Sequence, residues 1–354
     1  MGIDRESRNH NLERAAFPLA AVVASNDAKL ALLALAVDPG LRGVMIAGGP
    51  GMGKSLLARS FLALLAGSSN DRQAFVEVPL GVTEDRLLGG LRWEHALAAG
   101  ERRAAPGLLA QANRGFLYAD EINLLEPKVA HIVVSALNAG EVRVEREGLG
   151  IRFKSDFALI GTYDPAEGEL DPSLQDALGL HVRQSSPLGE QRTELLRRVE
   201  AHDRDPVQFC ELFATETARL ERRVREARGR LHTVGIATDD RRRLSLAAMA
   251  LGVEGHRADI FARRFACVHA ALDGRTSVEE TDLEIAVRWV LIPRATVSGA
   301  ARAASSTRQL DQTGSAPPQP DAGGGSAPES VRDLILKAAA CEVQAGLLDV
   351  PLSL

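Results

Sequence analysis

The glycine-rich segment GGPGMGKS, residues Gly48–Ser55, constrains this chain more than any other feature of its sequence. It matches the phosphate-binding pattern G-x-x-x-x-G-K-[ST] in full, and it lies between the apolar run VMIA and the helical pattern LLARSFLALLAG. A strand, a glycine-rich turn and a helix in that order let backbone N–H groups and the helix N-terminus face a phosphate group. The segment therefore predicts a nucleoside triphosphate site on a parallel α/β sheet.

Each position of this motif has an expected role. We expect Lys54 to reach the β- and γ-phosphates and the Ser55 hydroxyl to ligate Mg²⁺. The backbone that wraps the phosphates is expected to come from Gly48, Gly49, Pro50, Gly51, Met52 and Gly53.

A second motif completes the expected site. The apolar run FLYA leads directly into Asp120 and Glu121, 65 residues after Ser55. We expect Asp120 to hold Mg²⁺ through water, and Glu121 to act as the catalytic residue that orients and deprotonates the attacking water. ATP and Mg²⁺ are therefore the predicted cofactors.

The composition of the chain predicts a core followed by a helical lid. Residues 17–188 alternate short apolar runs with helical patterns, which indicates an αβα core. Its buried strands are predicted at Val44–Gly48, Ala74–Leu80, Gly115–Asp120 and Phe157–Tyr163. Residues 189–302 are mainly helical in pattern, and helices are predicted within Pro206–Arg230, Leu244–Leu251, His256–Leu272 and Thr281–Leu291. Cap chemistry for the last of these is expected within residues 277–282.

The two ends of the chain are expected to pack less. Residues 1–16 are polar and predict a flexible N-terminus without a secretory signal. Residues 303–330 are rich in Ala, Ser, Gly and Pro and predict a disordered linker. A short amphipathic helix is expected within residues 331–354.

The remaining bulk features exclude several classes of function. The formal net charge of −5 and the interleaved glutamates of RRVREARGR (Arg222–Arg230) favour a solvated or intersubunit helix over a nucleic-acid site. The apolar runs are too short for a membrane span, and the eight histidines lack metal-site spacing. Three separated cysteines without a C-x-x-C pair are typical of a reducing cytoplasm. They are Cys210, Cys267 and Cys341.

Four longer segments resemble the AAA+ subunits of magnesium chelatase, and the likeness runs from residue 17 to residue 295. Phe17–Pro39 is similar to the family's opening segment, and Leu87–Leu125 to its helix-2 insert and Walker B strand. Gly161–Val182 resembles its sensor 1 region, and Gly252–Arg264 its sensor 2 helix. The resemblance implies an AAA+ fold and a ring of AAA+ chelatase subunits. With a porphyrin-binding H subunit, such a ring drives Mg²⁺ insertion into protoporphyrin IX for chlorophyll and bacteriochlorophyll.

Two positions depart from the family's ATPase-active I subunit. The sensor 1 Asn of the family matches Asp164, whose charge would repel a γ-phosphate unless it is protonated or turned away. The arginine finger of the family matches Ala177, which cannot stabilise phosphoryl charge. The family's sensor 2 Arg is kept as Arg257, while the nearby Arg183 is not assigned the finger's role.

These departures favour a D-type subunit, which binds ATP and serves as a platform for an I-type ring. The family's D subunits join the AAA+ part through a Pro-rich linker to an integrin-I-like domain with a DxSxS motif. This sequence has the linker but no DxSxS, so that domain is expected to be missing from it. Intact Walker motifs and chain length keep an I-type motor with its own ATPase activity as an alternative. A MoxR-like AAA+ chaperone that matures another metalloenzyme is a third.

Overall fold

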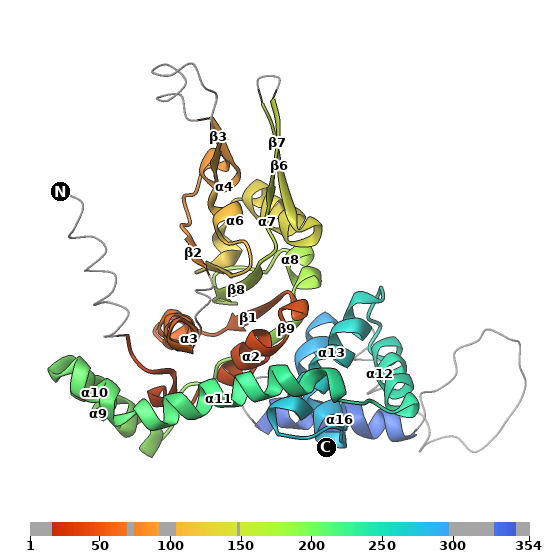
Figure 1. The fold of residues 1–354 in the computed structure, drawn as a ribbon. Helices are drawn as coiled ribbons and strands as arrows, with labels where there is room; N and C mark the ends of the chain where they lie inside the picture. The colour runs from red at the N-terminus through yellow and green to blue at the C-terminus, as the bar shows by residue number, and fades with distance from the viewer. Residues whose placement is uncertain (1–15, 69–73, 92–103, 147–148, 297–328, 345–354) are drawn as a thin grey trace, which may run out of the picture. The chain divides into compact units, whose positions relative to one another are not determined.

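The computed structural model describes residues 16–68, 74–91, 104–146, 149–296 and 329–344 of the chain (Figure 1). Its internal contacts divide the chain into two units, Met1–Arg228 and Gly229–Leu354. Composition predicts the boundary between core and lid between residues 188 and 189, which is earlier in the chain than this division. That predicted boundary stays a prediction. The predicted flexible N-terminus and linker lie almost wholly outside the described residues.

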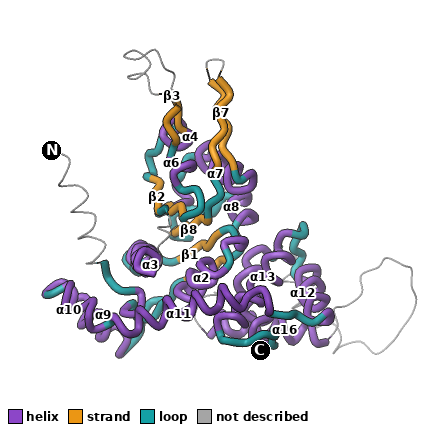
Figure 2. Tube along the Cα trace, in the orientation of Figure 1, coloured by secondary structure: helices purple, strands orange, loops and turns teal. Residues whose placement is uncertain are grey.

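The first unit contains a five-stranded parallel sheet in the order β2-β5-β8-β1-β9. Three of its strands, β2, β8 and β1, are labelled in Figure 2. The strands are β1 (Gly43–Ala47), β2 (Phe75–Val78), β5 (Phe116–Ala119), β8 (Ala158–Tyr163) and β9 (Leu180–Arg183). The four predicted strands are all present, and β9 was not predicted. One expectation is wrong, because β2 is an edge strand rather than a buried one, and its Phe75 is 40% exposed.

Helices cover both faces of this sheet. On one face lie α2 (Asn26–Val37) and α3 (Lys54–Ser68) (Figure 1). The rings of Phe61 in α3 and Phe116 in β5 pack edge to face, with 5.5 Å between their centroids. On the other face, Leu117 of β5 belongs to a buried cluster with residues of α7 (Pro127–Ala139) and α8 (Pro172–Ala177). The predicted αβα core is therefore confirmed.

A glycine sets the start of the strand that leads into Asp120. A Cβ atom at Gly115 would lie only 1.9 Å from the carbonyl oxygen of Ala74, so no other residue fits there. This close approach lets β5 pair with β2, whose Phe75 lies opposite Phe116 in the register.

Two antiparallel hairpins project from the core, and neither was predicted. They pair β3 (Gly89–Leu91) with β4 (Ala104–Pro106), and β6 (Glu141–Arg146) with β7 (Leu149–Lys154). Glu167 and Glu169 lie exposed in the turn between β8 and α8. The remaining helices of this unit are α4 (Glu84–Leu88), α6 (Leu108–Gln111), α9 (Glu190–Arg204), α10 (Pro206–Leu212) and α11 (Ala214–Arg230), whose end crosses the unit boundary.

The second unit is helical, as predicted. It contains α12 (Thr238–Ala250), α13 (Arg257–Leu272), α14 (Glu280–Ala286) with a π-helical continuation (Val287–Leu291), and α16 (Glu329–Gln344). The predicted C-terminal helix is present but begins two residues early, at Glu329, and it buries Val331 and Leu334. Across the described residues of both units, no helix is long and apolar enough to cross a membrane.

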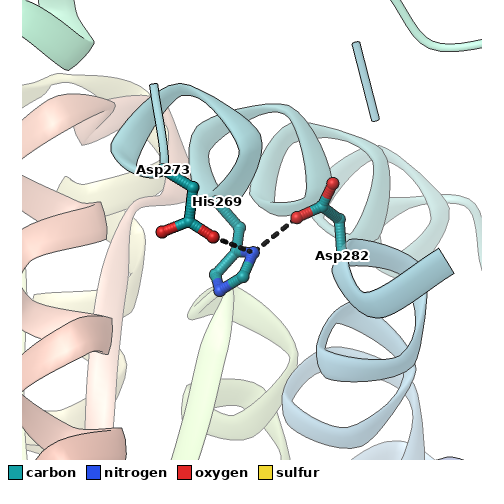
Figure 3. A group of neighbouring side chains, drawn as sticks. All are labelled: His269, Asp273 and Asp282. Atoms are coloured by element: carbon teal, nitrogen blue, oxygen red, sulfur yellow. Dashed lines mark hydrogen bonds and ion pairs between the residues drawn. The ribbon is translucent and has the colours of Figure 1, made fainter. Parts of the chain in front are cut away.

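A buried carboxylate organises the start of α14. Asp282 is fully buried. Its backbone N–H donates to the Glu279 side chain, and its carboxylate accepts the backbone N–H of Glu279. These two hydrogen bonds form a capping box, in the region where the sequence predicts cap chemistry. Arg275 donates to both oxygens of Asp282 at 2.6 and 2.7 Å. His269 Nδ1 lies 2.5 Å from one of these oxygens, as Figure 3 shows. Asp273 lies farther from the same ring nitrogen, at 3.9 Å. Because the guanidinium occupies both Asp282 oxygens, this cluster is a structural ion-pair network rather than a metal centre.

This network predicts an acid-sensitive second unit. Burial raises the pKa of Asp282, but hydrogen bonds from Arg275, His269 and the Glu279 N–H outweigh it and lower the pKa from 3.8 to about 2. The resulting stabilisation, about 2 kcal/mol, is present above pH 4 and is lost as the pH falls toward 2. Fluorescence of the buried Trp289, followed in a Trp93→Phe background, should show this loss in thermal unfolding between pH 5 and 2. Asp282→Asn should unfold at a lower temperature with a flatter pH dependence, and parallel pH profiles for the two proteins would contradict the assignment.

Candidate nucleotide-binding site

The glycine-rich turn between β1 and α3 has the backbone that a phosphate site needs. Gly51 and Gly53 take positive φ angles of 73° and 78°, a conformation that residues with a Cβ rarely adopt. Apart from the adjacent residues of the chain, no heavy atom lies within 4 Å of where a Cβ would stand on either glycine. The turn is therefore both glycine-dependent and open beside its backbone.

Lys54, the first residue of α3, curls back over this turn. Its side chain is buried, and its ammonium donates hydrogen bonds to the carbonyl oxygens of Gly48 and Gly49, the latter at 2.9 Å. An ammonium group has three donors and no acceptor, so phosphate oxygens can replace these carbonyls as its partners. The lysine is thus held beside the open turn.

The carboxylate of Asp120 connects three elements at the carboxyl edge of the sheet. Ser55 Oγ of α3 donates to Asp120 Oδ2 at 2.7 Å, and the Thr162 hydroxyl of β8 donates to Oδ1. The backbone N–H of Glu121 donates in turn to Thr162 Oγ1 at 3.3 Å. Burial raises the pKa of Asp120, but the hydrogen bonds from Thr162 and Ser55 outweigh this and lower it. Asp120 therefore stays ionised, as a ligand for a cation must.

Tyr118 places an unpartnered hydroxyl at the same point. Its side chain is completely buried, and its hydroxyl lies among Ser55, Asp120 and Thr162 without meeting any of them in hydrogen-bonding geometry. Burial raises the pKa of Tyr118 to about 12, so it remains a phenol. Carboxylate and hydroxyl oxygens are the ligands that Mg²⁺ prefers. These residues fit Mg²⁺, which Ser55 and Asp120 would hold.

Glu121 follows Asp120 in an unusual backbone conformation. Its φ and ψ angles of 50° and 47° are left-handed, which is uncommon for a residue other than glycine, asparagine or aspartate. Such strained residues concentrate at functional sites. The half-buried Glu121 lies two residues after the end of β5 and leads the chain into the 3₁₀ turn Ile122–Leu124.

Three residues at this site were not predicted. Thr162 and Tyr118 surround Asp120, and Gln184 supports the turn by donating from Nε2 to the Met52 carbonyl and to Ser25 Oγ, both at 2.7 Å. A polar residue inside the apolar run FALIGTY was the available signal for Thr162. Nothing in the sequence indicates the position of Gln184, because it depends on β9 pairing with β1.

The family's sensor and finger positions differ in environment. Asp164 is buried, and its Oδ1 accepts the N–H of Ala166 at 2.9 Å, so this oxygen belongs to its own turn. Ala177 is 1% exposed and packs in the same buried cluster as Leu174. Arg183 is exposed at the end of β9. Arg257 begins α13 in the second unit, half-buried, and its role toward a nucleotide stays a prediction.

Comparisons with known proteins identify the family. The family described as AAA domain (dynein-related subfamily) matches residues 43–178, and the AAA lid domain matches residues 241–316. The magnesium-chelatase 38 kDa subunit of Rhodobacter capsulatus is 38% identical over 77% of this chain and 85% of its own length. The chain belongs to the magnesium-chelatase AAA+ subunit family.

Two further similarities concern the length of the chain and its fold. The magnesium-chelatase 67 kDa subunit of Heliobacterium mobile is 41% identical over 79% of this chain, but the match covers 48% of that relative. This chelatase-family chain therefore spans about half the length of the 67 kDa relative. A solved structure from Cytophaga hutchinsonii, 17% identical, covers 86% of this chain and 92% of its own with a TM-score of 0.56, which shows the same fold.

The position of Lys54 yields a direct test of the nucleotide site. Lys54→Ala removes the buried ammonium beside the open turn, so ATP binding should fall below detection at concentrations that saturate the wild-type protein. Binding is followed by titration with a fluorescent ATP analogue. Lys128→Ala, which removes an exposed lysine paired with Glu84, serves as the control and should bind normally. Wild-type affinity in the Lys54 variant would disprove the site.

Proposed function

We propose that this chain is an ATP- and Mg²⁺-binding, D-type AAA+ subunit of magnesium chelatase, which supports ATP-driven insertion of Mg²⁺ into protoporphyrin IX. The observation that carries the proposal is the pairing of Ser55 with Asp120 beside an open, glycine-dependent turn, in a chain of this family. The expected partners are I-type AAA+ subunits in a ring and a porphyrin-binding H subunit. Family membership supports both.

The residues of the site have distinct tasks in this proposal. The bound Mg²⁺ would neutralise charge on the β- and γ-phosphates. Lys54 binds phosphate oxygens, Ser55 and Asp120 hold the cation, and Thr162 keeps the Asp120 carboxylate in place. Glu121 is positioned one residue later to take a proton from an attacking water.

The D-type assignment rests on the two departing positions. Asp164 is buried and has an acidic side chain where the family's motor subunits have an amide. Ala177 has no positively charged group that could reach the nucleotide site of a neighbouring subunit. An arginine finger is worth about 10³–10⁵ in rate where it has been measured, so its loss predicts weak intrinsic hydrolysis. The second candidate is an I-type motor, favoured by the match to 85% of the 38 kDa relative.

Turnover of ATP separates these two candidates. The purified chain should bind ATP but hydrolyse it poorly on its own, because both Asp164 and Ala177 lack the group that stabilises transferred phosphate. Phosphate release is measured for the chain alone, for a 38 kDa chelatase subunit alone and for the two mixed, with binding measured in parallel. Steady turnover by the isolated chain, lost in a Glu121→Gln variant, would favour the I-type motor instead.

Asp164 can be tested separately from Ala177. Asp164→Asn keeps the oxygen that accepts the Ala166 N–H and replaces the other by an amide donor, so the turn should survive. Removing one negative charge should strengthen binding of ATP by about tenfold relative to ADP, since only ATP carries a γ-phosphate. The ratio of the two dissociation constants, measured with Mg²⁺ present, checks this. Glu167→Gln, an exposed neighbour in the same turn, is the control, and an equal ratio in all three proteins would contradict a γ-phosphate contact.

A further inference from the structure

The orphaned hydroxyl of Tyr118 requires an explanation that the nucleotide motifs do not supply. The side chain is completely buried, and its hydroxyl has no hydrogen-bond partner. A buried donor left unpaired costs free energy, and native structures rarely keep one without a reason. The two neighbouring strands hold Tyr118 firmly, because β5 pairs with β2 on one side and β8 on the other.

The groups around this hydroxyl leave one charged acceptor for it. Asp120 already accepts one O–H on each carboxylate oxygen, from Ser55 and from Thr162, and each oxygen keeps a further lone pair. Ser55 donates its only proton to Asp120, so its own lone pairs remain available to a cation. A phenol O–H has a free donor, and Asp120 carries the charge that would attract it most strongly.

We propose that Tyr118 is a positioning residue of the magnesium site, whose hydroxyl donates a third hydrogen bond to Asp120 when Mg²⁺ and nucleotide are bound. The inference rests on the proposed ATP- and Mg²⁺-binding function. A cation held at Ser55 attracts the Asp120 carboxylate, and a small movement of that group brings it into hydrogen-bonding geometry with the phenol. Because this hydrogen bond forms only in the bound state, it strengthens Mg²⁺ binding and contributes nothing to the free protein.

A purely structural tyrosine would behave differently. If Tyr118 only filled the core, its hydroxyl would have no acceptor in either state, and its removal would leave Mg²⁺ binding unchanged. If the hydroxyl stabilised the free protein, its removal would lower the unfolding temperature without ligands. A positioning role predicts the opposite combination, with no loss of stability in the free protein and weaker Mg²⁺ binding in the complex.

The chain offers a matched control for this test. It contains two tyrosines, and the other one, Tyr163, lies half-buried at the end of the neighbouring strand β8. We would compare Tyr118→Phe, Tyr163→Phe and the wild-type chain in three measurements. These are the unfolding temperature without ligands, the affinity for a fluorescent ATP analogue in EDTA, and the Mg²⁺ concentration that half-saturates the nucleotide complex.

The expected result is specific to one variant and one measurement. Tyr118→Phe should raise the half-saturating Mg²⁺ concentration about tenfold, which corresponds to about 1.4 kcal/mol. Its unfolding temperature should be unchanged or higher, and its nucleotide affinity in EDTA should be unchanged. Tyr163→Phe should match the wild-type protein in all three measurements.

Three other results would overturn the inference. Equal Mg²⁺ midpoints in Tyr118→Phe and the wild-type protein would exclude the hydrogen bond. A lower unfolding temperature together with weaker binding in EDTA would assign Tyr118 a structural role. If the wild-type chain bound no nucleotide at all, both the proposed function and this inference would be overturned. That outcome differs from failure of the inference alone, because it is seen in the wild-type chain without any variant.

Discussion

The site depends on one carboxylate that holds a helix to two strands. Asp120 follows β5, and it accepts hydrogen bonds from Ser55 at the start of α3 and from Thr162 in β8. Parallel strands bring their carboxyl ends to the same edge of a sheet, so three distant segments can meet at a single residue there. The phosphate-binding turn lies directly before Ser55, and its position relative to the sheet is therefore set partly by Asp120.

The elements that the sequence predicts and the structure contains are those encoded in consecutive residues, while the roles of the site residues stay predictions. The turn Gly48–Ser55 and the pair Asp120–Glu121 are local patterns, because a strand, a tight turn and a helix start must follow one another along the chain. The strand positions followed from apolar runs of the right length, and the cap at Asp282 from polar residues before a helical pattern. Such features need no knowledge of which strands become neighbours.

The features that could not be predicted from the sequence depend on the order of the strands in the sheet. Gln184 reaches the turn because β9 lies beside β1, and the Tyr118 hydroxyl lies near Thr162 because β5 lies beside β8. The short strand β9 has no sequence pattern that marks it, whereas EVRVER, the segment of β6, carries the alternation that is typical of a strand. The exposure of β2 likewise follows from its place at the sheet edge, since a strand with one neighbour leaves a side uncovered.

Asp164 and Ala177, the two positions at which the sequence departs from the family's motor subunits, differ in how strongly the surrounding structure requires the residue that is present. The Asp164 side chain uses one oxygen to cap its own turn, a task that an asparagine oxygen performs equally well, so the fold does not require the charge. Ala177, by contrast, fills a buried position next to Leu174, where an arginine would have to bury its charge or repack the cluster. Replacing Asp164 by asparagine is therefore a local change. Placing an arginine at position 177 would need compensating changes in α8 and its neighbours. A side chain fixed by core packing is harder to replace than one fixed by a single charge, so in the proposal of a D-type subunit Ala177 carries more weight than Asp164.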